Sequence, residues 1–167
     1  MSKKKRIISF GIFIGVFLLA YSVGALYKMS DEEAKTFLGE FQSQTEGIDA
    51  IGIFSHNASV ALVMFVPAFG IAWGSYTAWS TGAAFSTIIS SDPTLSNISP
   101  LSLLATPFGT LELVAYSIGM SRSFLLIVGI VKRNSLKKMI KPTLIEIGIA
   151  IVILLIAGFI EYSMTGQ

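Results

Sequence analysis

The chain has 167 residues, of which 53% are hydrophobic and only 13% are charged, and its mean hydropathy is +0.72. These values lie outside the range of ordinary soluble domains and predict an integral membrane protein. The long uncharged runs predict helices rather than outer-membrane strands, so the predicted fold class is an all-α polytopic membrane helix bundle. The absence of cysteine excludes disulfides, thiolate nucleophiles and cysteine-ligated zinc.

The charges are distributed unevenly along the chain. Nine of the twelve basic residues lie in two clusters, at 3–6 and 132–141, and six of the ten acidic residues lie at 31–49. Because short cytoplasmic loops carry the excess of lysine and arginine, both basic clusters are predicted to be cytoplasmic and the acidic segment to lie outside. Each basic cluster directly abuts a hydrophobic run, which disfavours nucleic acid as a partner.

The first predicted membrane span covers residues 7–27, which contain no charge and follow the first basic cluster. A cleaved signal peptide is an alternative, because Val23-Gly24-Ala25 fits the small-residue cleavage pattern. Residues 30–47 predict an amphipathic helix on the outer side, with Ser30 and Glu33 forming a capping box and Gly47 ending the helix. This helix either binds a partner or lipid, or packs as a connector on the rim of the bundle. Its apolar residues follow helical spacing, at Ala34, Phe37, Leu38 and Phe41.

Residues 51–91 form an apolar or weakly polar run that is too long for one span. A break near Trp73–Tyr76 is predicted to divide the long run into spans 51–74 and 75–91, and two more spans are predicted at 101–131 and 142–162. An odd number of crossings must join the outer acidic segment to the inner 132–141 loop. We therefore expect five spans in a single domain, 1–167, with the carboxyl terminus outside. A re-entrant hairpin in place of one span, or four spans in all, are alternatives.

The most informative single residue is Glu112, an ionisable group placed by this pattern near the middle of a span. Such a group is costly and usually faces the protein interior or a water-filled cavity. Pro107 and Gly109 precede it by about one turn and predict a broken or kinked helix there. Glu112 is either a proton or cation site, or a hydrogen-bonded carboxyl that locks helices together. Arg122 lies about 15 Å away along a straight helix, too far to pair with it.

Other polar residues in the apolar runs are weaker candidates. His56 and Asn57 are predicted to make capping or interhelical hydrogen bonds, and a single histidine without cysteine makes no metal site. Glu146 and Glu161 are predicted near opposite ends of the last span, where each can reach an interface. No phosphate loop, catalytic triad or dinucleotide motif is present, so we expect neither an enzyme nor a cofactor.

The stretch Pro107-Phe108-Gly109-Thr110-Leu111-Glu112-Leu113-Val114-Ala115 resembles a signature of the stage II sporulation protein M family, Pro-His-Gly-x-x-Glu-x-x-Ala. Phe108 replaces the histidine of that signature, which puts in doubt any role that needs a titratable group there. Ser55-His56-Asn57 and Ala157-Gly158-Phe159-Ile160-Glu161 also resemble family motifs, so the resemblance covers about residues 54–165. It implies a multi-span membrane protein, and the family's namesake organises peptidoglycan-degrading partners in the membrane without being a hydrolase itself.

Two hypotheses of function follow from these patterns. The first is a non-enzymatic scaffold or accessory subunit of a membrane protein complex in the plasma membrane. Its partners would be the lipid bilayer and other membrane proteins, or further copies of itself. The alternative is a small oligomeric transporter or channel that uses Glu112 at a broken helix.

Overall fold

A computed structural model describes residues 3–95, 97–133, 135 and 137–165. Within these residues the chain is helical and contains no strand, which confirms the predicted all-α class. The elements, in chain order, are α1 (Lys3–Ala25), α2 (Asp31–Thr45), α3 (Ala50–Val63), α4 (Phe69–Ser91), a 3-10 turn (Pro93–Leu95), α5 (Ser102–Ala105), α6 (Pro107–Val131) and α7 (Lys137–Thr165).

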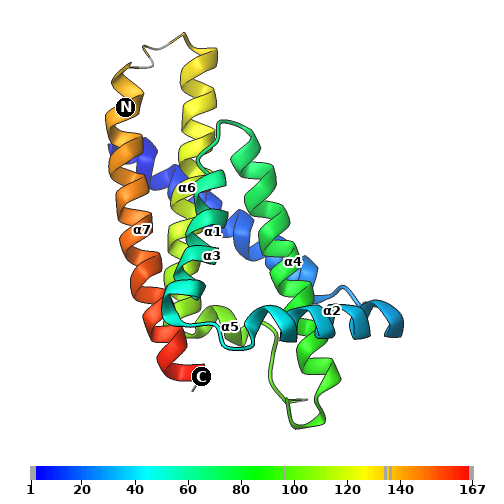
Figure 1. Ribbon diagram of the computed structural model, residues 1–167. Coiled ribbons are helices and arrows are strands. Elements are labelled where there is room, and N and C mark those ends of the chain that lie inside the picture. Colours follow the sequence, from blue (N-terminus) through cyan, green and yellow to red (C-terminus); the bar gives the residue numbers. More distant parts are fainter. Residues whose placement is uncertain (1–2, 96, 134, 136, 166–167) are drawn as a thin grey trace.

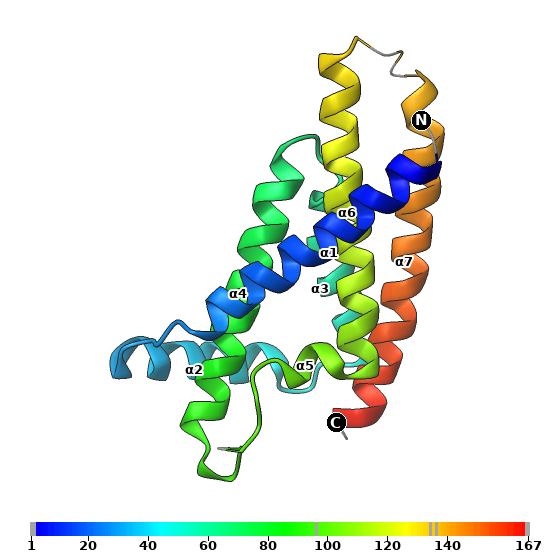
Figure 2. The same ribbon diagram turned by 180° about the vertical axis from the view of Figure 1, so that it is seen from behind.

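The helices form a bundle built around α6 and α7, which stand side by side and antiparallel (Figure 1). The shorter helix α3 packs against the lower half of α7, and α4 lies on the other side of α6. Helix α1 crosses the bundle obliquely and packs against α4 and α6, as Figure 2 shows from behind. The amino terminus lies near the upper end, beside the start of α7, and the carboxyl terminus lies at the lower end.

Three helices, α1, α6 and α7, are long and apolar enough to cross a membrane. Helix α3 has 14 residues and is therefore about 21 Å long, less than the roughly 30 Å thickness of the hydrocarbon core. The chain is thus built as a helical membrane protein, while the total of five spans stays a prediction.

The predicted break near Trp73–Tyr76 is wrong, because α4 runs through these residues without interruption. The chain reverses direction earlier, at residues 64–68, between α3 and α4. Pro67 lacks an amide hydrogen and disfavours helical backbone at the residue before it, so helix cannot continue through this segment. Ala68 has a φ of 63° and the amide of Phe69 donates to the carbonyl of Pro67, which together make a tight γ-turn.

The α3–α4 hairpin begins and ends at the lower end of the bundle (Figure 1). Its tip is tied to α6, since the hydroxyl of Ser123 donates to the carbonyl of Val66 at 2.6 Å. The indole of Trp73 joins the two arms by donating to the carbonyl of Val60 at 3.1 Å. Because the hairpin returns to the end where it started, the termini remain at opposite ends whether it crosses the membrane twice or enters from one side only.

Close backbone approach at two glycines sets the crossing of α1 and α4. A Cβ atom on Gly24 would lie 1.9 Å from the carbonyl oxygen of Trp79, and one on Gly82 would lie 2.2 Å from that of Tyr21. Any larger side chain at these positions would push the helices apart. By contrast, Gly11 and Gly15 have no atom within 4 Å of such a Cβ, so this pair makes no internal contact despite its helix-packing spacing.

Helix α2 has the ends that its sequence predicts. The side chain of Ser30 accepts from the amide of Glu33, the carboxylate of Glu33 accepts from the amide of Ser30 at 2.8 Å, and Gly47 adopts a φ of 72° just beyond the helix. The hydrogen bonds from the Ser30 backbone and hydroxyl hold the pKa of Glu33 below its usual 4.5. No residue of α2 is buried, so the helix lies on the bundle without entering its core.

The start of the last helix differs from the prediction. Helix α7 begins at Lys137, five residues before the predicted start of the last span, and Pro142 lies inside it. Pro142 lacks an amide hydrogen, but it lies in the second turn of this 29-residue helix, so only one hydrogen bond near the start of the helix is lost. The basic residues 137–141 therefore extend α7 upward instead of forming a loop.

Candidate functional site

The signature stretch forms the beginning of α6. Thr106 is the N-cap residue, and its hydroxyl accepts from the amide of Gly109 at 3.0 Å. Pro107 occupies the first turn, where its missing amide has no intrahelical partner to lose. Gly109 packs against the preceding turn, because a Cβ atom there would lie 2.1 Å from the carbonyl oxygen of Leu103.

This arrangement corrects the expected position of Glu112. The predicted break is present between α5 and α6, and Pro107 and Gly109 start the helix that follows it. Glu112 then lies in the second turn of α6, about 8 Å along the axis from Pro107, and not near the middle of a span. The carboxyl group is placed toward the lower end of the bundle, which is the end that carries α2 and the carboxyl terminus.

Glu112 receives a direct hydrogen bond from another helix. The Nδ2 atom of Asn57 on α3 donates to Oε1 of Glu112 at 2.6 Å. Glu161, near the end of α7, lies close enough for its charge to act on both Glu112 and the neighbouring Tyr116. The amide and the two carboxyl groups thus come from three different helices. Such a group can fix how these helices pack, or it can hold a proton.

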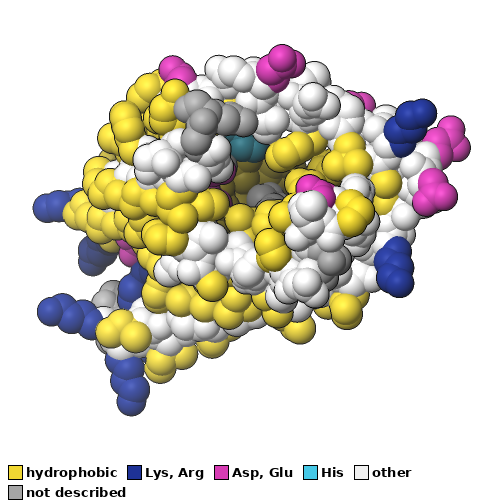
Figure 3. All heavy atoms as spheres, turned by 90° about the horizontal axis from the view of Figure 1, so that it is seen from below, with side chains coloured by type: hydrophobic (Ala, Val, Ile, Leu, Met, Phe, Trp, Pro, Cys, Tyr) yellow, Lys and Arg dark blue, Asp and Glu magenta, His cyan; other side chains and the backbone are white. Residues whose placement is uncertain are grey.

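His56 stands next to Asn57 in sequence but is exposed on α3. Figure 3 views the lower end of the molecule and shows it hollowed between the helices, with carboxylate and histidine side chains near the opening. His56, Asn57 and Glu112 therefore lie toward the same end of the bundle. Within the described residues, no group of three or more histidine, aspartate or glutamate side chains could hold a metal ion.

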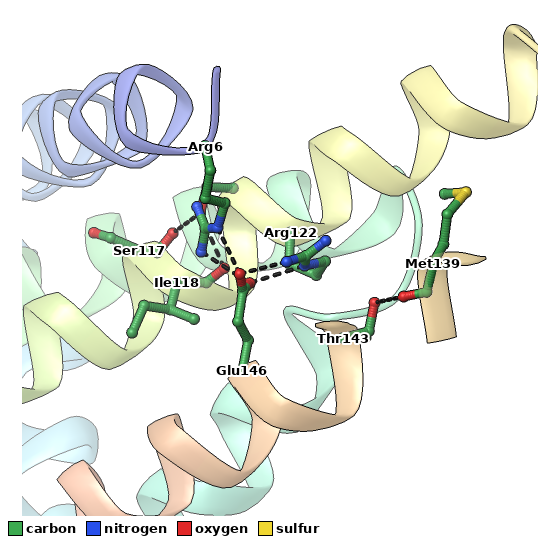
Figure 4. Close-up of polar contacts among 8 residues, drawn as sticks. Arg6, Ser117, Ile118, Arg122, Met139, Thr143 and Glu146 are labelled. Atoms are coloured by element: carbon green, nitrogen blue, oxygen red, sulfur yellow. Dashed lines mark hydrogen bonds and ion pairs between the residues drawn. The ribbon is translucent and has the colours of Figure 1, made fainter. Parts of the chain in front are cut away.

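A second polar site lies nearer the upper end and involves residues that the sequence analysis did not connect. Glu146 of α7 is bound by two guanidinium groups (Figure 4). Arg122 of α6 donates from Nε to Oε2 at 2.8 Å and from Nη2 to Oε1. Arg6 of α1 donates from Nε to Oε1 at 2.6 Å and from Nη2 to Oε2 at 2.9 Å. We call these three residues the ionic cluster.

The ionic cluster continues into one hydroxyl group of α6. Arg6 donates from Nη1 to the hydroxyl of Ser121 at 2.7 Å, and that hydroxyl donates to the carbonyl of Ser117 at 2.6 Å. Arg122 is 5% exposed, so its side chain is almost fully desolvated. Two cations share one carboxylate here, which leaves the cluster with a net charge of +1 in a largely desolvated place.

Sequence reasoning missed this cluster because it placed Glu146 at an interface. Its residues are far apart in the chain, at positions 6, 122 and 146, and no local motif joins them. The one signal that could have joined two of them needs the actual start of α7 at Lys137, and the predicted start at 142 hid it. Arg122 lies nine residues before the end of α6, and Glu146 lies nine residues after the start of α7. In an antiparallel helix pair with a short connection, equal distances from the connection place two residues at the same level.

The family match covers both polar sites apart from Arg6, which lies one residue before its start. The family model described as "Stage II sporulation protein M" matches residues 7–165, nearly the whole chain. The chain belongs to the stage II sporulation protein M family. No curated protein and no solved structure matches it. The match confirms the resemblance seen at about residues 54–165 and extends it towards the amino terminus as far as residue 7.

Proposed function

We propose that this stage II sporulation protein M family member is a non-enzymatic scaffold or accessory subunit of a membrane protein complex. The observation that carries the proposal is the low burial of the residues of α2. This helix is amphipathic and well capped, yet it buries no residue against its own bundle. Ala34, Phe37 and Leu38 are only partly buried, and Phe41 is exposed. A stable helix with such a partly covered apolar face is suited to bind another protein.

The apolar face of α2 has an aromatic centre. Phe37 and Phe41 stack with ring centroids 5.9 Å apart, and Phe41 is 43% exposed. Beside them, a groove of about 520 Å³ lies between α2 and residues 27–30 of the connection from α1 to α2. Aromatic side chains line it together with acidic ones, among them Glu32 and Glu40. This surface suits a partner segment that carries both apolar and basic side chains.

The two polar sites fit the same proposal because each ties helices together. The bond between Asn57 and Glu112 joins α3 to α6, and the ionic cluster joins α1, α6 and α7. The carboxyl groups thus have a structural part in fixing how the helices of a scaffold pack.

A photocrosslinking residue of aromatic shape, placed at Phe41, tests the proposal in native membranes of the producing cells. We expect a covalent adduct with a discrete membrane protein, which mass spectrometry would identify. The same residue at Ser43 is the matched control, since Ser43 is exposed on the opposite face of the same helix. Adducts with lipid alone at position 41, or the same protein adducts at both positions, would contradict a recruiting surface on α2.

A further inference from the structure

A large cleft opens at the upper end of the molecule, next to the ionic cluster. Its volume is about 900 Å³, within the range of ligand sites in proteins. It lies between the start of α1, the last turns of α6 and the first turns of α7. This is the end of the bundle where the amino terminus and the connection between α6 and α7 meet (Figure 1).

The cleft is strongly basic on one side. Lys3, Lys132 and Lys138 line it, and none of the ion pairs in the described part of the chain involves any of them. The ionic cluster, which also lines the cleft, adds a net charge of +1. One carboxylate, that of Glu146, therefore faces an excess of positive charge, and an anion bound in the cleft would offset it.

The other side of the cleft is apolar and open. Ile8 and Ile12 of α1 and Phe124 of α6 line it, and they are 51%, 56% and 39% exposed. All three lie in helices long and apolar enough to cross a membrane, deeper along each helix than the lysines at its end. The cleft thus joins a charged rim at the membrane surface to an apolar wall that faces lipid.

A buried hydroxyl inside the cleft also lacks a partner. Ser9 lines the cleft and is 4% exposed, and its Oγ atom has no hydrogen-bond partner among the described residues. Buried polar atoms in proteins are nearly always hydrogen-bonded, so an unpaired one calls for a missing acceptor or donor. Ser9 lies one turn from Arg6 on α1, and its hydroxyl can therefore serve the same ligand as the guanidinium group.

We propose that this cleft binds the headgroup of an anionic phospholipid from the surrounding leaflet. The lysines and the ionic cluster hold the phosphate, the Ser9 hydroxyl donates to the ligand, and the acyl chains lie along Ile8, Ile12 and Phe124. A soluble phosphate would use the basic rim but leave the apolar wall uncovered. Basic pockets between membrane helices on the cytoplasmic side commonly take anionic headgroups, and the positive charges place this cleft on that side.

Native mass spectrometry of the full chain in mild detergent tests the proposal with phosphatidylglycerol and phosphatidylcholine of equal chain length. We expect phosphatidylglycerol to bind preferentially. In the variant Lys3→Ser/Lys132→Ser/Lys138→Ser, its affinity should fall about tenfold to hundredfold, because each lysine near an anionic group contributes roughly a fivefold gain. All three side chains are exposed, so their replacement leaves the core intact.

The matched control is Lys4→Ser/Lys137→Ser/Lys141→Ser, which removes the same charge from the same end of the molecule outside the cleft. We expect this variant to bind phosphatidylglycerol like the parent. Equal losses in both triple variants would overturn the proposal in favour of general attraction to an anionic surface. Equal binding of the two lipids would overturn it as well. Displacement of the lipid by millimolar glycerol phosphate would assign the cleft to a soluble phosphate instead.

Discussion

The ionic cluster holds two positive charges and one negative charge among side chains that are mostly removed from water. Its three members are not equivalent. Replacing either arginine by glutamine leaves one arginine paired with Glu146, so the remaining charges balance. Replacing Glu146 by glutamine leaves two cations facing each other without a counter-charge, which is the costly arrangement in a desolvated place.

We therefore predict that Glu146→Gln lowers the free energy of unfolding by about 3–5 kcal/mol, more than Arg6→Gln or Arg122→Gln does. Thermal melts of the purified protein in detergent give the ranking. The control is Glu46→Gln, which removes an exposed carboxyl at the end of α2. If Arg6→Gln proves more damaging than Glu146→Gln, the charge balance of the cluster does not determine its stability.

The role of Glu112 can be tested through its hydrogen bond from Asn57. Glu112→Gln keeps the shape and the acceptor for Asn57 while removing titration, so a structural role predicts a stability and a partner recovery close to those of the parent. Glu112→Leu leaves the Asn57 amide without its partner and should cost about 1–3 kcal/mol. The double variant Asn57→Leu/Glu112→Leu removes both groups and should recover part of that loss. A Glu112→Gln protein that folds normally but is inactive in cells would favour the transporter or channel hypothesis.

At the scale of the elements, the contact between α1 and α4 depends on backbone surfaces with no side chain between them. We predict that Gly24→Ala lowers the free energy of unfolding by about 1–3 kcal/mol, since its Cβ would meet the backbone oxygen of Trp79 at 1.9 Å. Gly15→Ala on the same helix is the control. It has open space around it, so the better helix propensity of alanine should make it neutral or slightly stabilising. Equal melting temperatures for the two variants would mean that the crossing is looser than the structure describes.

The ends of the elements show which features the sequence could predict. The bounds of α2 follow from signals within a few residues, namely the capping box at Ser30 and the left-handed Gly47, and both were predicted correctly. The break between α3 and α4 was placed wrongly, at Trp73–Tyr76, a stretch that contains Gly74; a glycine can interrupt a helix or let another helix approach closely. In the structure Gly74 is a contact site: a Cβ atom there would lie 2.5 Å from the side chain of Met120 on α6. Only tertiary packing distinguishes these two uses of a glycine.

The same limit applies to the polar sites. The signature around Glu112 was recognisable because its residues are consecutive, but its position at the start of a helix was not predicted and comes from the structure, in which Thr106 is the N-cap. The partner on α3, Asn57, and the ionic cluster depend on which helices become neighbours. That arrangement is set by the bundle as a whole, so no local pattern could specify it.

At the scale of the whole molecule, charge is divided between the two ends. The amino terminus and the connection between α6 and α7, both basic, lie at the upper end, and the acidic α2 lies at the lower end with the carboxyl terminus (Figure 1). Because cytoplasmic segments prefer lysine and arginine, we predict that the upper end faces the cytoplasm and the lower end faces outside. The lipid cleft and the recruiting face of α2 would then act on opposite sides of one membrane.

This orientation can be tested by single cysteines, because the native chain has none. We predict that a membrane-impermeant thiol reagent labels Ser43→Cys on α2 and Ser163→Cys near the carboxyl end in intact cells. Lys137→Cys, at the start of α7, should react only after the membrane is opened. All three positions are exposed in the folded protein, so access to the reagent is decided by the membrane and not by burial. Labelling of Lys137→Cys alone in intact cells would invert the orientation. The path of α3, α4, α6 and α7 gives an even number of crossings between α2 and the carboxyl terminus, so positions 43 and 163 should lie on the same side of the membrane. Labelling of Ser43→Cys without Ser163→Cys would contradict this path.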